Sequence, residues 1–109
     1  MDKATRTAVE TFLDRVGTRY PVAQALLYGS RARGDARPDS DADVAVILGG
    51  PAGDFWDIKF VLSDIAYDVF LESGILIEAL PIWQGEWQHP EAYTNPALLR
   101  NIRTEGVAL

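Results

Sequence analysis

Two short apolar runs, joined by a polar stretch, constrain the fold of this chain most. The first run covers residues 23–28 after Pro21, and the second covers residues 41–48 with the sequence DADVAVIL. Runs of this length that are rich in branched side chains and closed by glycine or proline are typical of buried strands. The stretch between them contains Gly34 and Pro38, which predicts a turn or a very short helix followed by a loop.

Helical periodicity flanks this pair of strands. Val9, Phe12 and Val16 recur at helical spacing, which predicts an amphipathic helix over residues 2–16. The other expected elements are a helix from a cap at Asp54 to about residue 72 that Gly74 ends, a strand over residues 75–80 that Pro81 ends, an irregular aromatic segment over residues 83–93, and a final helix over residues 96–103 that Asn95 caps and Gly106 ends.

The order of these elements predicts the fold class. Helix, strand, turn, strand, helix, strand and helix follow one another, which indicates an α/β domain. We expect a small mixed sheet of three or more strands with helices packed on one face. A chain of 109 residues suits one core, so residues 1–109 are expected to form a single domain.

Composition limits the chemistry that is available. The chain has no cysteine and a single histidine, His89, which excludes disulfides and leaves too few sulfur and nitrogen ligands for a zinc site. A metal would be held by oxygen atoms, which favours magnesium, manganese or calcium. Ten basic against sixteen acidic residues give a net charge of −6, whereas a general nucleic-acid binder needs a basic surface. No run is long enough to span a membrane and no signal-peptide core is present, so we expect a cytoplasmic protein without membrane partners.

The residues that point to chemistry stand at the ends of the two strands. Gly29-Ser30 follows the first strand, where glycine lets the backbone approach a bulky anion and Ser30 can donate to phosphate oxygens. Asp41 and Asp43 begin the second strand, and residues two apart on a strand point to the same face, about 7 Å apart. Two carboxylates so placed repel each other unless a cation lies between them, and they suit a pair of magnesium ions. The two strand ends therefore predict a phosphate-binding half and a metal-binding half.

This pattern resembles a known signature. Gly29-Ser30, ten intervening residues and then Asp41-x-Asp43 resemble the motif of the DNA polymerase β-like nucleotidyltransferase superfamily. The longer string YGSRARGDARPDSDADVAVIL resembles its minimal branch, the MNT domains, and the ending ALLRNIRTEGVAL resembles their tail. MNT domains are often encoded beside a HEPN-domain protein as the antitoxin of a toxin–antitoxin pair, as MntA-like antitoxins are. The resemblance implies a nucleotidyltransferase-like fold.

The resemblance also implies a role for individual residues. Gly29 and Ser30 would bind the β- and γ-phosphates of ATP, and Arg33 stands in the family's Gly-Ser-x-x-Arg-Gly pattern. Asp41 and Asp43 would coordinate two Mg²⁺ ions. The family places a third carboxylate on a later strand, and the acid of that strand here is Glu78. Family members commonly have aspartate there, some minimal ones lack the acid, and a shift of one residue would turn it to the other face.

The function implied is transfer of AMP from ATP to a hydroxyl acceptor, with a tyrosine of a partner HEPN toxin as the favoured acceptor. Two alternatives stay open: an antitoxin that inhibits a HEPN ribonuclease by binding alone, with the aromatic segment 83–93 as its interface, and a small-molecule nucleotidyltransferase of the aminoglycoside type. The acidic balance argues against templated polymerisation. The partners expected are therefore ATP and another protein, in a hetero-complex or an oligomer, without direct nucleic-acid contact.

Several residues also have a purely structural interpretation. Arg31, Arg33 and Arg37 could pair on the surface with Asp35 and Asp39. Aromatic residues dominate cores and interfaces, which is the favoured interpretation of Trp56, Trp83 and Trp87, and His89 is expected in a loop. The base that accepts the hydroxyl proton could be Asp43, Glu78 or a metal-bound hydroxide.

Overall fold

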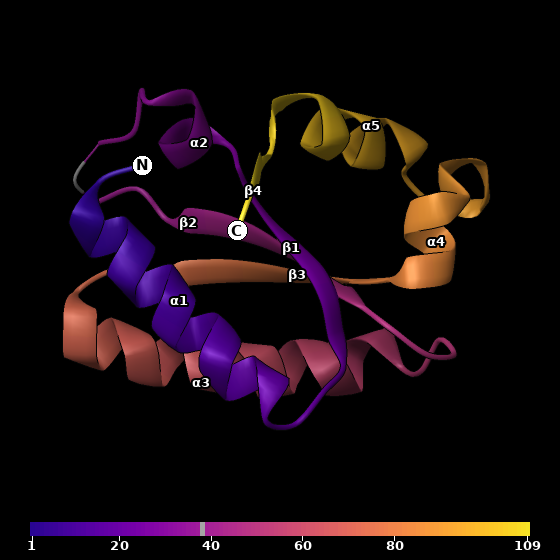
Figure 1. Cartoon of the computed structure of the whole chain (residues 1–109), viewed down its shortest axis with the longest axis horizontal. Helices are drawn as coiled ribbons and strands as arrows, with labels where there is room; N and C mark the ends of the chain where they lie inside the picture. Colours follow the sequence, from indigo (N-terminus) through magenta and orange to yellow (C-terminus); the bar gives the residue numbers. More distant parts are fainter. Residues whose placement is uncertain (38) are drawn as a thin grey trace.

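The computed structural model describes residues 1–37 and 39–109, and these form an α/β domain around one mixed sheet (Figure 1). The strand order is β3-β2-β1-β4, with β1 antiparallel to β2 and β4, and β2 parallel to β3. Pro38, part of the predicted connection, lies outside the described residues. The elements are α1 (Lys3–Gly17), β1 (Val22–Tyr28), α2 (Ser30–Arg33), β2 (Ala42–Leu48), α3 (Phe55–Ser73), β3 (Ile77–Trp83), α4 (Gln84–Gln88), the 3₁₀ helix η1 (Pro90–Ala92), α5 (Pro96–Glu105) and β4 (Val107–Ala108).

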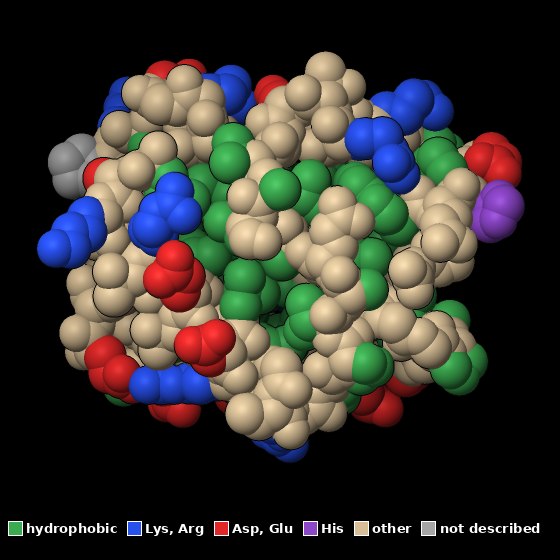
Figure 2. All heavy atoms as spheres, in the orientation of Figure 1, with side chains coloured by type: hydrophobic (Ala, Val, Ile, Leu, Met, Phe, Trp, Pro, Cys, Tyr) green, Lys and Arg blue, Asp and Glu red, His purple; other side chains and the backbone are tan. Residues whose placement is uncertain are grey.

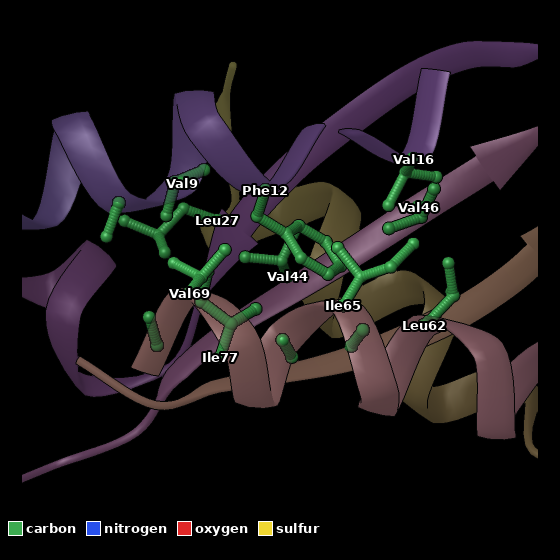
Figure 3. Packing of buried hydrophobic residues seen from close by; sticks show 14 of the residues in the cluster. Val9, Phe12, Val16, Leu27, Val44, Val46, Leu62, Ile65, Val69 and Ile77 are labelled. Carbon is green, nitrogen blue, oxygen red and sulfur yellow. The ribbon is translucent and has the colours of Figure 1, made fainter. Parts of the chain in front are cut away.

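The larger part of the core lies between one face of the sheet and the helices α1 and α3. Phe12 of α1 and Leu62 of α3 are fully buried and belong to the same cluster as Val44 and Val46 of β2. Figure 3 shows these side chains pointing toward one another from both helices and the strand. The helical spacing of Val9, Phe12 and Val16 in the sequence identified this buried face of α1 correctly.

A second hydrophobic cluster lies on the opposite face of the sheet. Ala45 and Ile47 of β2 pack there with Trp87 of α4 and with Leu99 and Ile102 of α5. The expected arrangement with helices on one face therefore holds for α1 and α3 but misses α4 and α5. The physical reason is that β2 is apolar on both sides, and a strand of this kind is covered on both faces.

Side-chain caps place the helix starts close to where the sequence predicts them. Asp2, Asp54 and Asn95 each accept a hydrogen bond from the backbone N–H three residues further on. Gly74 ends α3 with a left-handed φ of 76°, as expected.

The C-terminal part of the sequence prediction needs three corrections. Pro81 lies inside β3 and does not end it. Because β3 is an edge strand, the N–H group that proline lacks costs no hydrogen bond of the ladder. The segment predicted as irregular forms α4 and η1, with Trp83 and Trp87 buried. The two-residue strand β4 was missed, since a run this short has no periodicity.

The surface over α1 carries charges of both signs, while hydrophobic side chains gather toward the centre of the same view (Figure 2). A hollow of about 220 Å³ beside α1 is lined by Arg6, Glu10, Leu13, Asp14 and Leu109. Among the described residues, none of the helices has the length and apolar character needed to cross a membrane.

Arg31 fixes the connection between β1 and β2 to α1. Its guanidinium donates two hydrogen bonds to the carbonyl oxygen of Ser40, at 2.9 and 2.7 Å, and one to Thr5 Oγ1 at 3.0 Å. Asp2 Oδ2 lies 3.9 Å from the same group, and only 9% of the Arg31 side chain is exposed. These partners differ from Asp35 and Asp39, so the surface ion pair considered for Arg31 is wrong.

Replacement of Arg31 by alanine is expected to lower the free energy of unfolding by about 2 kcal/mol, because buried hydrogen bonds from a charged donor are lost together. Equilibrium unfolding in urea measures the change. Arg19→Ala, at an exposed position between α1 and β1, is the matched control and should change the free energy by less than about 0.5 kcal/mol. An equal effect of both substitutions would contradict a bracing role for Arg31.

Candidate functional site

Gly29 joins the end of β1 to α2 and lies against the carboxylate of Asp43. Its φ is 75°, in the left-handed region that favours glycine. A Cβ atom at this position would overlap Asp43 Oδ2 and would lie 3.3 Å from Asp43 Cγ. The close approach follows from the register, in which Tyr28 is paired with Asp43 across the antiparallel strands. The structure therefore brings the two halves of the predicted motif into contact.

Asp43 points away from α1 and α3. Its neighbours Ala42 and Val44 are buried in the cluster that contains those helices, and side chains alternate along a strand, so Asp43 lies on the other face. Asp41 immediately precedes β2 and is exposed. Burial raises the pKa of the Asp43 carboxyl above its ordinary value, and the negative charges of Asp41 and Glu78 raise it further. The acids expected to act together therefore influence one another electrostatically.

Glu78 lies next to Asp43 in the sheet. The two residues are paired in the parallel β2–β3 ladder, and because Ile77 and Ala79 face the α1–α3 core, Glu78 faces the same side as Asp43. Its Oε1, however, accepts a hydrogen bond from Lys59 Nζ at 2.6 Å. In residues 1–37 and 39–109, no three acidic or histidine side chains gather closely enough to hold a metal ion. Glu78 thus has the position of a third acid but is engaged in an ion pair.

Ser30 and Arg33 occupy the first and last positions of the four-residue helix α2. Ser30 is partly exposed, and its carbonyl oxygen accepts hydrogen bonds from the N–H groups of Gly34 and Asp35. Arg33 Nε lies 3.4 Å from Asp35 Oδ2, and Arg33 Nη1 lies 3.7 Å from Glu105 Oε1 at the end of α5. The positive charge of Arg33 also lowers the pKa of Asp43, against the larger effects that raise it. Arg33 therefore lies beside the acids and links α2 to α5.

Sequence reasoning missed Tyr28 and Lys59 as members of this site. Tyr28 is paired with Asp43, and burial, helped by the charges of Asp43 and Glu78, raises the pKa of its phenol to about 12. Lys59 comes from α3 and reaches Glu78 from 19 positions away in the sequence. The position of Tyr28 directly before Gly29-Ser30 was a usable signal, but nothing in the sequence pointed to Lys59.

The raised pKa of Tyr28 predicts that its phenol ionises only at strongly alkaline pH. A phenol whose pKa is higher in the folded state adds stability below pH 10, and this contribution is lost as the pH rises through about 12. In metal-free buffer with EDTA, absorbance at the tyrosinate band should show that Tyr28 ionises about two pH units above an ordinary phenol. Asp43→Asn should move this ionisation to lower pH, and an unchanged curve would contradict the proximity of the two groups.

Asp41 and Asp43 fit a divalent cation by the chemistry of their oxygen atoms. Carboxylates are the ligands that Mg²⁺ prefers in proteins. The crowding of negative charge that raises the pKa of Asp43 would be relieved by a cation. Glu78 would join them by exchanging its ion pair with Lys59 for the metal.

The tryptophans divide into two groups. Trp83 and Trp87 are buried, as expected for core residues, and the guanidinium of Arg103 lies 4.1 Å from the ring centre of Trp87. Trp56 is 62% exposed on α3 and contributes nothing to the core. His89 ends α4 with an exposed side chain 3.5 Å from Glu91 Oε1, close to the loop position predicted for it.

Two solved structures share the fold. A crystal structure of a Sulfolobus solfataricus protein assigned as a nucleotidyltransferase superposes with a TM-score of 0.62 and 16% identity over 99% of this chain and 86% of its own. A crystal structure of a toxin–antitoxin with AMP-PNP superposes with a TM-score of 0.60 and 14% identity, over 94% of this chain and 69% of its own. No curated protein matches the sequence.

The family model for the nucleotidyltransferase domain matches residues 9–81. This range is well over half of the chain and spans the turn at Gly29 and both acids, Asp41 and Asp43. With the fold and the placement of these residues in agreement, the chain belongs to the nucleotidyltransferase domain family.

Proposed function

We propose that this chain is a magnesium-dependent enzyme that transfers AMP from ATP to a hydroxyl acceptor. The observation that carries the proposal is the contact of the Asp43 carboxylate with the Gly29 turn, at a position where the register also brings Glu78 alongside. A turn that can bind phosphate therefore lies next to carboxylates that can hold a divalent cation. Family membership supports nucleotidyl transfer in general.

In this proposal each residue of the motif has a distinct role. The backbone at Gly29 and the hydroxyl of Ser30 bind the triphosphate, and Arg33 adds positive charge beside it. Asp41 and Asp43 hold Mg²⁺, with Glu78 as the third ligand. The metal supplies, when bound, charge neutralisation for the triphosphate and for the leaving group.

The reaction exchanges one bond at phosphorus for another. The acceptor oxygen forms a bond to the α-phosphorus of ATP while the bond from that phosphorus to the bridging oxygen breaks, and pyrophosphate leaves. The hydroxyl proton passes to a carboxylate of the acidic set. Asp43 suits this step because burial and the neighbouring acids raise its pKa, which makes its carboxylate a stronger base than an ordinary one.

The acceptor we favour is a tyrosine of a partner HEPN toxin, so that this chain is an MNT antitoxin that silences its partner by AMPylation. Two independent features support this choice. The Gly-Ser-x-x-Arg-Gly and Asp-x-Asp strings resemble those of MNT domains, and a toxin–antitoxin complex with AMP-PNP has the same fold. The surrounding cell compartment would be the cytoplasm.

Labelled ATP tests the proposal directly. The chain is incubated with Mg²⁺, the product of the neighbouring gene and ATP carrying the label on its α-phosphate. The α-label should appear on the partner protein, and it should be absent when EDTA is added. ATP labelled on its γ-phosphate should leave the partner unlabelled. A tight complex that never acquires α-label would contradict transfer and would favour inhibition by binding alone.

One observation favours that alternative, a non-catalytic antitoxin. Glu78 is held by Lys59, and no three acids gather as a metal site in the described part of the chain. Replacing Glu78 by glutamine separates the two roles of this acid. If it is a metal ligand, Glu78→Gln should lower transfer by about tenfold or more, whereas Lys59→Met should leave Glu78 available and reduce transfer much less. Equal and small effects of both would identify Glu78 as only an ion-pair partner.

A further inference from the structure

The outer face of α3 carries a row of exposed apolar side chains, in two groups that the exposed Ser63 separates. Trp56, Phe60, Tyr67 and Leu71 are 62%, 64%, 56% and 65% exposed, and Phe70 is 36% exposed. Their spacing of four, seven and four residues places the first four on one side of a helix with 3.6 residues per turn. We call these five residues the outer α3 stripe.

The outer α3 stripe lies opposite the side of α3 that packs on the sheet. Leu62, Ile65, Ala66 and Val69 form that buried side, about half a turn away around the helix. The helix is thus apolar on both sides, and helices of this kind are normally covered on both. The ring pairs Trp56–Phe60 and Tyr67–Phe70 lie 6.2 and 6.3 Å apart, so the stripe presents packed aromatic surface.

The exposed area is large for a monomer. Because an aromatic side chain carries about 150–250 Å² of surface, the stripe exposes roughly 600 Å². This is most of the roughly 800 Å² that each partner buries in a standard protein–protein interface. An exposed apolar area at the upper limit found on monomers is often an interaction site.

Charge selects the kind of partner. Asp57, Asp64 and Asp68 are exposed along one border of the stripe, while Lys59 on the other border is already paired with Glu78. In an antiparallel two-fold pair of α3 helices, the acidic border would face its own copy, and each copy carries a net charge of −6. Repulsion therefore disfavours a second copy of this chain, and attraction favours a basic surface.

We propose that the outer α3 stripe is the docking surface for a partner protein that presents an apolar helical ridge bordered by basic side chains. The stripe and Asp43 lie on opposite sides of the sheet, because Asp43 faces away from α3. A partner docked on α3 therefore leaves the turn at Gly29 open to a nucleotide. This inference does not depend on transfer chemistry.

Trp56 provides the reporter for the test, since Trp83 and Trp87 are each only 6% exposed. The probe is an amphipathic leucine/lysine peptide long enough to cover α3, compared with a leucine/glutamate peptide of the same pattern. The lysine peptide should shift tryptophan emission to shorter wavelength and protect it from acrylamide, with binding that weakens as salt rises. The glutamate peptide should bind at least about tenfold more weakly.

Matched variants locate the binding. Phe60→Gln with Leu71→Gln, both at exposed positions, should weaken binding of the lysine peptide by about tenfold or more. The triple variant Asp57→Asn, Asp64→Asn, Asp68→Asn should reduce the salt dependence of peptide binding, whereas Glu10→Gln with Asp14→Asn on α1 should not.

A variant of the proposed metal ligands separates docking from transfer. Asp41→Asn with Asp43→Asn should bind the peptide normally, whatever its effect on transfer.

Three results would overturn the proposal. Equal binding of both peptides would show that charge does not select the partner. Unchanged binding after loss of Phe60 and Leu71 would place the peptide elsewhere. A dimer in sedimentation that dissociates in the Phe60→Gln, Leu71→Gln variant would assign the stripe to a second copy of this chain.

Discussion

Replacement of Asp41 and Asp43 by asparagine should reduce AMP transfer by about a thousandfold or more while leaving the protein folded. Loss of the charge that holds a divalent cation removes several kcal/mol of stabilisation from the transition state, and each 1.36 kcal/mol corresponds to tenfold in rate. Transfer of α-label from ATP at saturating Mg²⁺ measures the loss. Asp14→Asn, an exposed acid on α1, is the control and should retain full activity.

Replacement of Asp43 alone by asparagine should remove activity without lowering the stability of the metal-free protein at neutral pH. Because the pKa of Asp43 is raised in the folded protein, its contribution to stability is full at low pH and is lost as the pH rises through that pKa. Without metal, Asp43→Asn should therefore be at least as stable as the parent at neutral pH and should lack this part of the pH dependence. Urea unfolding at acidic and neutral pH gives the comparison. A variant that loses both activity and stability would indicate a structural role for the acid.

Replacement of Gly29 by alanine should lower the free energy of unfolding by about 2–4 kcal/mol and should also abolish transfer. An alanine at φ 75° and ψ −156° costs about 1–3 kcal/mol, because only glycine readily enters this region, and its Cβ would displace the Asp43 carboxylate, which adds the cost of a shifted strand end. Equilibrium unfolding and the transfer assay measure the two effects.

Gly34 gives the cost of a positive φ without the contact. Its φ of 84° and ψ of 11° lie in the αL region, whereas the ψ of Gly29 is −156°, and a Cβ added at Gly34 would meet nothing within 4 Å. Gly34→Ala should therefore cost only the backbone term of about 1–2 kcal/mol. Adding Asp43→Ala to Gly29→Ala should recover part of the stability, because the displaced carboxylate is gone. Equal costs for Gly29→Ala and Gly34→Ala would contradict the close contact with Asp43.

The sequence predicts the motif well because its parts are local. Gly29-Ser30 and Asp41-x-Asp43 each combine a strand end with a short polar string, and the register then brings Gly29 and Asp43 together without further information. The helix starts at Asp2, Asp54 and Asn95 follow from side-chain caps that lie within three residues of their partners.

Features that depend on distant partners were not predictable in this way. The face of Glu78 could be judged only from the register of β3, since one residue of slip would reverse it. The ion pair of Glu78 with Lys59 joins residues from different elements. The covering of the second face by α5 depends on packing, although the continuous apolar run of β2 was a signal that both faces would be buried.

The edge strand β3 limits how this domain can associate with other chains. Pro81 offers no N–H along that edge, and the Nζ atom of Lys59 already binds the carbonyl oxygen of Ala79. On the opposite margin, β4 is only two residues long. The β3 margin is thus a poor template for β-augmentation or amyloid-like stacking, whereas β4 covers only Leu26 and Leu27 of β1. Association of this domain along β3 should therefore leave its β-structure content unchanged, a property that infrared spectroscopy in the amide I region can follow.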